Sequence, residues 1–241
     1  MLLEGKTALI TGAGRGIGRG IAEAFAKQGC DVAAVARTLE QVEDTADLVR
    51  GSGRRALAVA CDVSRPEEVT RCVDRVLTEF GQIDLLVNNA GVAIFKPFAE
   101  TTLEDWRRTL DVNLTGAFLM MKAVMPSMME RKKGRIINIS SVAGLKPLVD
   151  QGAYCASKYG LNGLSKVLAM ELREHNIAVH AICPGGVDTE LARDAMPDRD
   201  KSNWMQPEDI ANACLYLASL HPRATVDELS IRRFGSVPLG G

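Results

Sequence analysis

The 241-residue sequence predicts one α/β domain built on a doubly wound, mostly parallel sheet with helices on both faces. Two observations predict this fold class. Short apolar runs alternate with longer segments of helical periodicity, and no linker interrupts them. The early runs are apolar on both faces, as strands are when helices cover each side of a parallel sheet. A chain of this length forms one sizeable core, so we expect a single domain over residues 1–241.

The expected elements follow one another in regular alternation. The strands cover 7–11, 31–36, 56–60, 85–88, 135–139, 178–183 and 228–232, and the helices cover 16–28, 39–50, 66–80, 103–130, 153–175 and 207–219. Ser64 and Thr102 are each followed three residues later by an acid, Glu67 and Asp105, which is the pattern of a capping box. Pro207 suits the first turn of the last helix.

Composition excludes several classes of function. A net charge of −1 gives no electrostatic reason to expect nucleic acid or an anionic membrane as a partner. The sequence has no apolar run of about 18 residues and no signal-peptide pattern, so we expect a cytoplasmic protein. The six cysteines and three histidines lack the spacing of metal ligands, so no metal site is predicted.

The distinctive motifs each follow an expected strand. In chain order they are Gly12-x-x-x-Gly16-x-Gly18, Asp62, Asn88-Asn89-Ala90-Gly91, Ser140-Ser141 and Pro184-Gly185-Gly186. Ligands of doubly wound sheets bind outside the carboxyl ends of the strands. We therefore expect these motifs to form one composite site.

The glycine-rich turn predicts a site for a dinucleotide phosphate. Glycines permit a tight turn, and the following helix presents its N-terminus to the pyrophosphate; an ordinary glycine turn is the alternative. The second strand ends in Ala36 and Arg37, so it lacks the acid that would bind the ribose hydroxyl of NAD. Arg15 and Arg37 instead offer two cations for a 2′-phosphate. This favours NADP(H) over NAD(H), unless Arg37 only caps the next helix.

Tyr154 and Lys158 predict acid–base chemistry. Four residues apart, they lie on one face of a helix. A lysine cation near a phenol favours the phenolate and lowers the tyrosine pKa, which suits a general acid or base. The alternative is a tyrosine that only packs in the core. Proton transfer beside a dinucleotide points to hydride transfer.

Taken together, these motifs resemble the short-chain dehydrogenase/reductase family over roughly residues 5–220. The resemblance implies a Rossmann-type sheet of about seven strands that binds a nicotinamide dinucleotide. It implies cofactor contacts from Gly12, Gly14, Arg15, Gly16, Ile17, Gly18, Arg37, Asp62, Val63, Asn89, Ala90, Gly91, Tyr154, Lys158, Pro184, Gly185, Val187 and Thr189. Asp62 would bind the adenine amino group, and Val187 and Thr189 would contact the carboxamide.

The resemblance also implies four catalytic residues, Asn113, Ser141, Tyr154 and Lys158. Ser141 would bind the substrate oxygen, and Tyr154 would transfer the proton. Lys158 would lower the tyrosine pKa and hold the ribose, and Asn113 would position a water linked to Lys158. A cofactor-binding protein without turnover is the alternative from another class, but no catalytic residue is missing.

The sequence says less about the substrate. The chain is most similar to 3-oxoacyl-(acyl-carrier-protein) reductases, which would make a β-keto thioester the substrate. Its tail is more similar to the branch that acts on small 3-hydroxy acids, where Arg232 or Arg233 would bind a carboxylate or simply face solvent. General carbonyl compounds are a further alternative. A short substrate lid is expected near residues 187–206.

The family resemblance also implies partners. Carrier proteins would dock on cations at the ends of the two long helices. Lys132 fits the first position, whereas His175 replaces the expected arginine at the second, so this partner stays open. The two long helices usually form the interface of a homodimer or homotetramer in this family.

Overall fold

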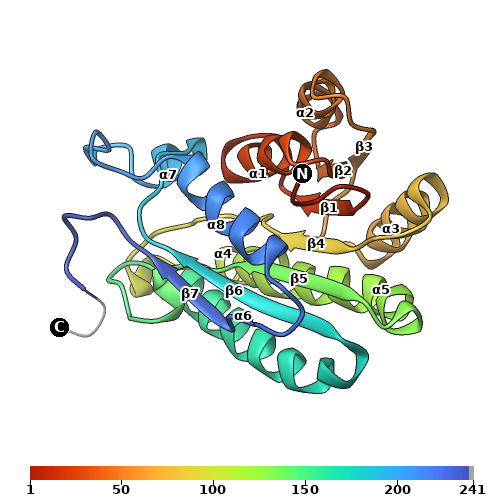
Figure 1. Cartoon of the computed structure of the whole chain (residues 1–241). Helices are drawn as coiled ribbons and strands as arrows, with labels where there is room; N and C mark the ends of the chain where they lie inside the picture. The colour runs from red at the N-terminus through yellow and green to blue at the C-terminus, as the bar shows by residue number, and fades with distance from the viewer. Residues whose placement is uncertain (239–241) are drawn as a thin grey trace.

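The computed structural model describes residues 1–238, and its centre is a sheet of seven strands (Figure 1). The strands are β1 (Thr7–Thr11), β2 (Asp31–Ala36), β3 (Ala56–Ala60), β4 (Leu85–Asn88), β5 (Gly134–Ile139), β6 (Ile177–Pro184) and β7 (Glu228–Ile231). Their order is β3-β2-β1-β4-β5-β6-β7, and every neighbouring pair is parallel. The doubly wound prediction is confirmed, and the direction of winding reverses between β1 and β4.

Helices cover both faces of the sheet. They are α1 (Gly16–Lys27), α2 (Leu39–Gly51), α3 (Pro66–Phe80), α4 (Leu103–Leu110), α5 (Gly116–Arg131), α6 (Gly152–Glu171), α7 (Glu190–Ala195) and α8 (Pro207–Ser219). One buried cluster joins the sheet to α1, α2 and α8, and a second joins it to α3, α5 and α6. Along β1, Ala8 and Ile10 belong to the first cluster and Leu9 to the second. Burial of both faces explains the continuous apolar runs of the strands.

The two expected capping boxes have different outcomes. At the start of α4, the Thr102 hydroxyl accepts from the Asp105 backbone N–H at 3.0 Å, and the box is complete. At α3 the prediction is wrong: Arg65 is the N-cap residue and makes no side-chain cap. The Ser64 hydroxyl instead donates to Asp62 Oδ1 at 2.7 Å. Local bonding to Asp62 competes with capping of the helix.

The expected helix over 103–130 is interrupted. A π-turn, Asp111–Thr115, separates α4 from α5. One more short helix, α7, lies inside the segment that the sequence predicts as a lid. In Figure 1, α7 and the tail after β7 lie toward the same end of the sheet.

Within residues 1–238, no helix is both long and apolar enough to cross a membrane. The same residues contain no group of three or more His, Cys, Asp or Glu side chains arranged to hold a metal ion.

Candidate active site

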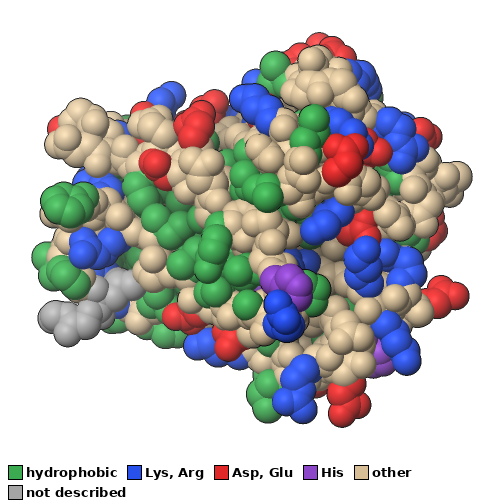
Figure 2. All heavy atoms as spheres, viewed as in Figure 1, with side chains coloured by type: hydrophobic (Ala, Val, Ile, Leu, Met, Phe, Trp, Pro, Cys, Tyr) green, Lys and Arg blue, Asp and Glu red, His purple; other side chains and the backbone are tan. Residues whose placement is uncertain are grey.

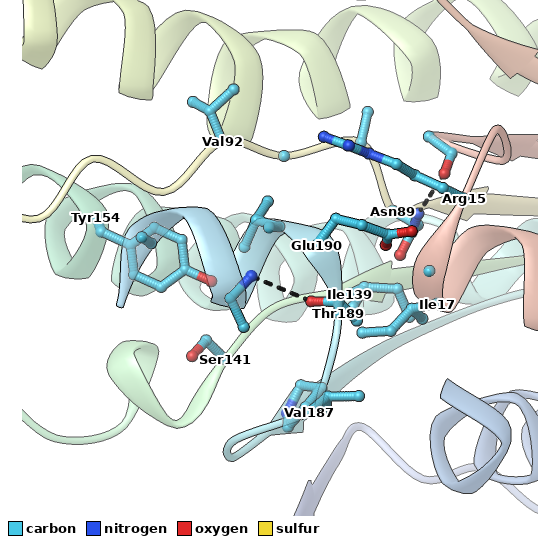
Figure 3. Close-up of a pocket in the computed structure, with 18 of the residues that line it drawn as sticks. Arg15, Ile17, Asn89, Val92, Ile139, Ser141, Tyr154, Val187, Thr189 and Glu190 are labelled. Carbon is cyan, nitrogen blue, oxygen red and sulfur yellow. Dashed lines mark hydrogen bonds between the residues drawn. The ribbon is translucent and has the colours of Figure 1, made fainter. Parts of the chain in front are cut away.

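A cavity of about 510 Å³ lies at the carboxyl ends of the central strands (Figure 3). Its lining includes a residue after each of six strands: Gly12, Arg37, Asp62, Asn89, Ser141 and Gly185. Figure 3 shows Arg15 and Asn89 at one end of the cavity and Tyr154 and Ser141 at the other. We call these the cofactor end and the substrate end.

Most of the residues expected to bind a cofactor line this cavity, and Gly18 is the exception. Of the four expected catalytic residues, Ser141, Tyr154 and Lys158 line it, whereas Asn113 is buried outside the lining. The sheet therefore brings motifs that are far apart in sequence into one site.

The turn between β1 and α1 needs glycine for two separate reasons. Gly12 has a φ of 64°, in the left-handed region that favours glycine. Gly18 lies inside the first turn of α1, where an added Cβ would be 2.3 Å from the Gly12 oxygen and 2.5 Å from Asn89 Nδ2. Gly18 thus supports the site by letting α1 approach β1 closely. Arg15, the N-cap residue, makes no side-chain cap to the first-turn amides of α1.

Two cations stand at the outer part of the cofactor end. The side chains of Arg15 and Arg37 are exposed, and within residues 1–238 neither guanidinium makes a hydrogen bond or an ion pair. Arg19 differs, because its guanidinium donates to the Gly14 carbonyl at 2.7 Å and to Thr45 Oγ1 at 3.2 Å. Arg19 therefore supports the glycine turn, whereas Arg15 and Arg37 have donors available for an anionic ligand.

Asp62 stands near these cations at the end of β3. Burial opposes ionisation of its carboxyl, but hydrogen bonds from Ser64 and the charges of Arg37 and Arg65 outweigh burial and lower the pKa. Ser64 occupies Oδ1, and within the described chain Oδ2 makes no hydrogen bond. An ionised carboxylate with a free oxygen can accept from an amino group.

Asn89 joins the ends of the two strands at the point where the winding reverses. Its Nδ2 donates to the carbonyls of Thr11 and Gly12, at 3.0 and 3.1 Å. The Thr11 hydroxyl accepts from the backbone N–H groups of Asn89 and Ala90, both at 3.0 Å. These bonds fix the glycine turn against the loop after β4.

Three of the expected catalytic residues, Ser141, Tyr154 and Lys158, lie at the substrate end. Ser141 follows β5, and its hydroxyl accepts from the Ala143 N–H at 3.0 Å, so its own proton can be donated to Tyr154 or to a ligand. Lys158 is buried, and its Nζ donates to the Ile139 carbonyl at 2.9 Å. The same Nζ lies 5.6 Å from the centre of the Tyr154 ring. The ring of Phe95 packs edge-on against Tyr154, with 5.4 Å between ring centres.

Burial shifts the pKa values of these two groups in opposite directions. It raises the pKa of Tyr154 to about 12, against a smaller lowering effect of a hydrogen bond with Ser141. It lowers the pKa of Lys158 to about 8. The expected lowering of the tyrosine pKa by Lys158 is not seen, because removal of the phenol from water is the larger effect. At neutral pH Tyr154 therefore keeps its proton.

Asn113 lies in the π-turn and connects the loop after β4 to α6. Its Oδ1 accepts from the Val92 N–H at 2.8 Å, and its Nδ2 donates to the Val92 carbonyl and to Ser157 Oγ. The Ser157 hydroxyl donates in turn to the Tyr154 carbonyl at 2.7 Å. Both amide hydrogens are thus used within the protein, so this side chain positions the loop after β4 against the start of α6.

The expected lid forms a loop whose ends are tied together. Met205 N donates to the Gly186 carbonyl at 3.2 Å, and Asp188 N donates to the Met205 carbonyl at 2.8 Å. Met196, Trp204 and the tail residue Arg233 line the substrate end together with residues that the sequence motifs do not mark: Phe95, Val142, Leu148, Gln151 and Arg199. These last residues come from loops of differing sequence position, and no local pattern identifies them.

Comparison with known proteins decides the family. Residues 6–200 match the family model described as short chain dehydrogenase. The chain belongs to the short-chain dehydrogenase/reductase family.

Three relatives illustrate the range within this family. The chain is 42% identical to a D-threitol dehydrogenase of Mycolicibacterium smegmatis over 226 residues, which cover 90% of this chain and 87% of the relative. It is 36% identical to the 3-oxoacyl-(acyl-carrier-protein) reductase of Escherichia coli over 228 residues, covering 91% and 92%. A crystal structure of a metagenomic short-chain oxidoreductase in complex with NADP superposes with a TM-score of 0.86 at 34% identity, covering 98% and 100%.

This short-chain dehydrogenase/reductase is therefore an oxidoreductase that acts on CH–OH groups with a nicotinamide dinucleotide. Its own residues fit such a cofactor. Gly12, Gly14 and Gly16 line the cavity where α1 begins, and the guanidinium groups of Arg15 and Arg37 beside them have no partner in the described chain.

Proposed function

We propose that this enzyme uses NADP(H) to interconvert a carbonyl and a secondary alcohol, with Tyr154 as the general acid and base. One observation carries the proposal: Ser141, Tyr154 and Lys158 line the same cavity as the glycine turn and its two unpaired arginines. Proton transfer and cofactor binding then meet in one enclosed space.

In the reductive direction, a nicotinamide cofactor held at the glycine turn and the two arginines would supply a hydride for the carbonyl carbon. Negative charge then collects on the substrate oxygen as the C=O π bond opens. The Ser141 hydroxyl donates a hydrogen bond to this oxygen, and Tyr154 transfers its proton there to complete the alcohol. The Lys158 cation stabilises the phenolate that remains. Asn113 has a positioning role, because its hydrogen bonds fix the loop after β4 against the start of α6.

The preference for NADP(H) over NAD(H) rests on charge. Ala36 ends β2 where an NAD site would use an acid, and Arg37 follows it with an exposed guanidinium. Arg15 adds a second cation at the same end of the cavity. A 2′-phosphate would receive charge-assisted hydrogen bonds from these two side chains.

Two classes of substrate have support. A 3-oxoacyl thioester follows from the 36% identity to the reductase of Escherichia coli. A small hydroxy compound is supported by the 42% identity to the threitol dehydrogenase. The tail residue Arg233, which lines the cavity, suits the small 3-hydroxy acids among such compounds. Docking of a carrier protein has weaker support. Lys132 and His175 lie just beyond the far ends of α5 and α6, and α6 alone extends roughly 25 Å beyond Tyr154.

The test is the initial rate of NADPH oxidation with acetoacetyl thioester and with acetoacetate, beside NADP⁺ reduction with threitol. Each rate is also measured with Tyr154→Phe and with the NAD(H) form of the cofactor. We expect the phenylalanine variant to lose roughly 10²- to 10⁴-fold in kcat while still binding NADPH. Equal rates for Tyr154→Phe and wild type would contradict the proposed role of the tyrosine.

We also propose that the enzyme is a homodimer or homotetramer. Large apolar side chains stay exposed on α4, α5 and α6: Leu103, Trp106, Phe118, Tyr159, Val167 and Met170. Figure 2 shows a further gathering of apolar side chains over α8 and β7, where Tyr216 is about half exposed. Two such faces suit a tetramer. Light scattering on the purified protein measures the assembly, and a monomer at micromolar concentration would contradict it.

A further inference from the structure

A cation without a partner lies at the substrate end of the cavity. Arg233 follows β7 by two residues, lines the cavity and is half-buried. Within residues 1–238 its guanidinium makes no hydrogen bond and no ion pair. Partly removing a charge from water is unfavourable unless another group compensates for it. This side chain therefore has an unused capacity to bind an anion.

The neighbouring Arg232 has a different role. Its Nη1 donates to the backbone carbonyls of Arg233, Phe234 and Ser236, so it holds the tail in a turn. The Ser236 hydroxyl and backbone N–H both donate to the Arg233 carbonyl, at 2.8 and 3.1 Å. The backbone of Arg233 is thus fixed while its guanidinium stays free.

Trp204 holds the Arg233 side chain in place. The guanidinium carbon lies 5.5 Å from the centre of the Trp204 ring, within the range of a cation–π interaction. The indole is buried and packs against Gly186, where an added Cβ would lie 2.9 Å from the ring. Lys201 also approaches this ring, but its Nζ donates to the carbonyls of Met196 and Arg199. Of the two cations beside the Trp204 ring, Arg233 is therefore the one whose N–H donors have no partner in the described chain.

The position of Arg233 separates it from the cofactor end. Arg37 follows β2 and Arg233 follows β7, which are five strand spacings apart in the sheet order. At about 4.8 Å per spacing, this is roughly 24 Å. Ser141 follows β5, two strands from β7, so Arg233 lies on the catalytic half of the cavity.

We infer that Arg233, positioned by Trp204, forms a carboxylate-binding subsite that selects small 3-oxo or 3-hydroxy acids. A planar guanidinium matches a carboxylate with two parallel hydrogen bonds. Phe95, Leu148 and Met196 add apolar side chains to the lining of the same cavity, and a less polar surrounding strengthens an ion pair. The choice of substrate rests on the proposed function, whereas binding of the carboxylate does not require turnover.

The experiment compares acetoacetate with its methyl ester, which lacks the negative charge and is larger by one methyl group. The wild type should have the higher kcat/KM for the acid. Arg233→Gln should lower kcat/KM for the acid by roughly 10- to 100-fold and should affect the ester much less. Arg223→Gln is the control, because Arg223 is exposed and does not line the cavity. It should change neither value by more than about threefold.

A binding measurement separates failure of the subsite from failure of the proposed reaction. Trp106→Phe leaves Trp204 as the only tryptophan, so its fluorescence reports on the neighbourhood of Arg233. Acetoacetate should give a saturable change in emission, and Arg233→Gln should abolish it even if no carbonyl is reduced. Equal losses for acid and ester, equal effects of the two arginine variants, or a saturable response that survives Arg233→Gln would each overturn the subsite.

Discussion

The two ends of the cavity differ in what forms their walls: mainly backbone at the cofactor end and side chains at the substrate end. At the cofactor end, the Gly12 carbonyl, the Gly18 backbone and the Asn89 carboxamide lie in direct contact. At the substrate end, the wall consists of side chains from distant segments, and Trp204 and Arg233 meet across the lid and the tail. A site made of backbone has little freedom to adapt. A wall made of side chains can change its shape and charge without disturbing the sheet.

The largest loss of stability and of cofactor affinity should come from adding a methyl group at Gly18, where α1 and β1 are in close contact. In Gly18→Ala the new methyl group would lie 2.3 Å from the Gly12 carbonyl oxygen, so α1 and β1 must move apart. We expect a loss of about 3 kcal/mol or more in the free energy of unfolding. The Kd for NADPH should rise more than roughly tenfold, because 1.4 kcal/mol of lost binding free energy already gives that factor. Denaturant unfolding and NADPH fluorescence titration measure the two quantities.

Gly51→Ala is the control for this variant. Gly51 ends α2, and an added Cβ there meets no atom within 4 Å. This substitution should raise stability by about 0.5–1 kcal/mol, as alanine does elsewhere in helices. Similar destabilisation in both variants would refute the idea that close contact is the cause.

The two free cations of the cofactor end should have the next largest effect. Arg37→Gln and Arg15→Gln should each weaken NADPH binding by roughly tenfold, because each removes charge-assisted hydrogen bonds to a phosphate. NADH binding should stay within about twofold for Arg37→Gln, since NADH lacks the 2′-phosphate. An equal loss for both cofactors would mean that Arg37 does not recognise that phosphate.

Adding a methyl group at the substrate end should reduce activity and stability less than adding one at Gly18. In Gly186→Ala the new Cβ would lie 2.9 Å from the Trp204 ring, a side chain that can shift. We expect KM for the carbonyl substrate to rise by about threefold to tenfold, since displaced binding groups cost on the order of 1 kcal/mol. NADPH binding should stay near the wild-type value. A loss of NADPH affinity as large as that of Gly18→Ala would remove the distinction between the two ends.

Lys158 lies beside Tyr154 at the substrate end, and its replacement should give the smallest change in stability. Burial lowers its pKa to about 8, so at neutral pH the charged amine is less favourable in the folded chain than in the unfolded one. Lys158→Met should therefore lose activity yet raise Tm at pH 7 by about 2–4 °C.

The advantage of Lys158→Met over the wild type should shrink as pH rises from about 8 toward 10.5, the unperturbed lysine value. In that window the folded wild type has released the proton while the unfolded chain still binds it, so wild-type stability increases with pH. A scan of Tm against pH for both proteins measures this, and parallel curves would contradict the shift.

Sequence could predict the cofactor end well because its signals are local. Each of these signals is read from a few consecutive residues: the glycine-rich turn, the Ala36-Arg37 pair and the ends of the strands. The bounds of β1 to β4 agree with the predicted ones. The substrate end has no such signal, because Phe95, Leu148 and Gln151 meet only through tertiary packing. The tyrosine pKa was predicted in the wrong direction for a similar reason, since burial depends on the whole fold.

The π-turn at Asp111–Thr115 holds one residue more than an α-helical turn would. Each residue of an α-helix turns it by about 100°, and the wider turn absorbs the extra residue, so α4 and α5 keep nearly the orientation of one continuous helix. Deleting one residue here should therefore restore an unbroken α-helix with little rotation of α4 against α5. The deletion would still move Asn113 away from its bonds to Val92 and Ser157. Shortening this stretch should thus spare the fold and cost the alignment of the site.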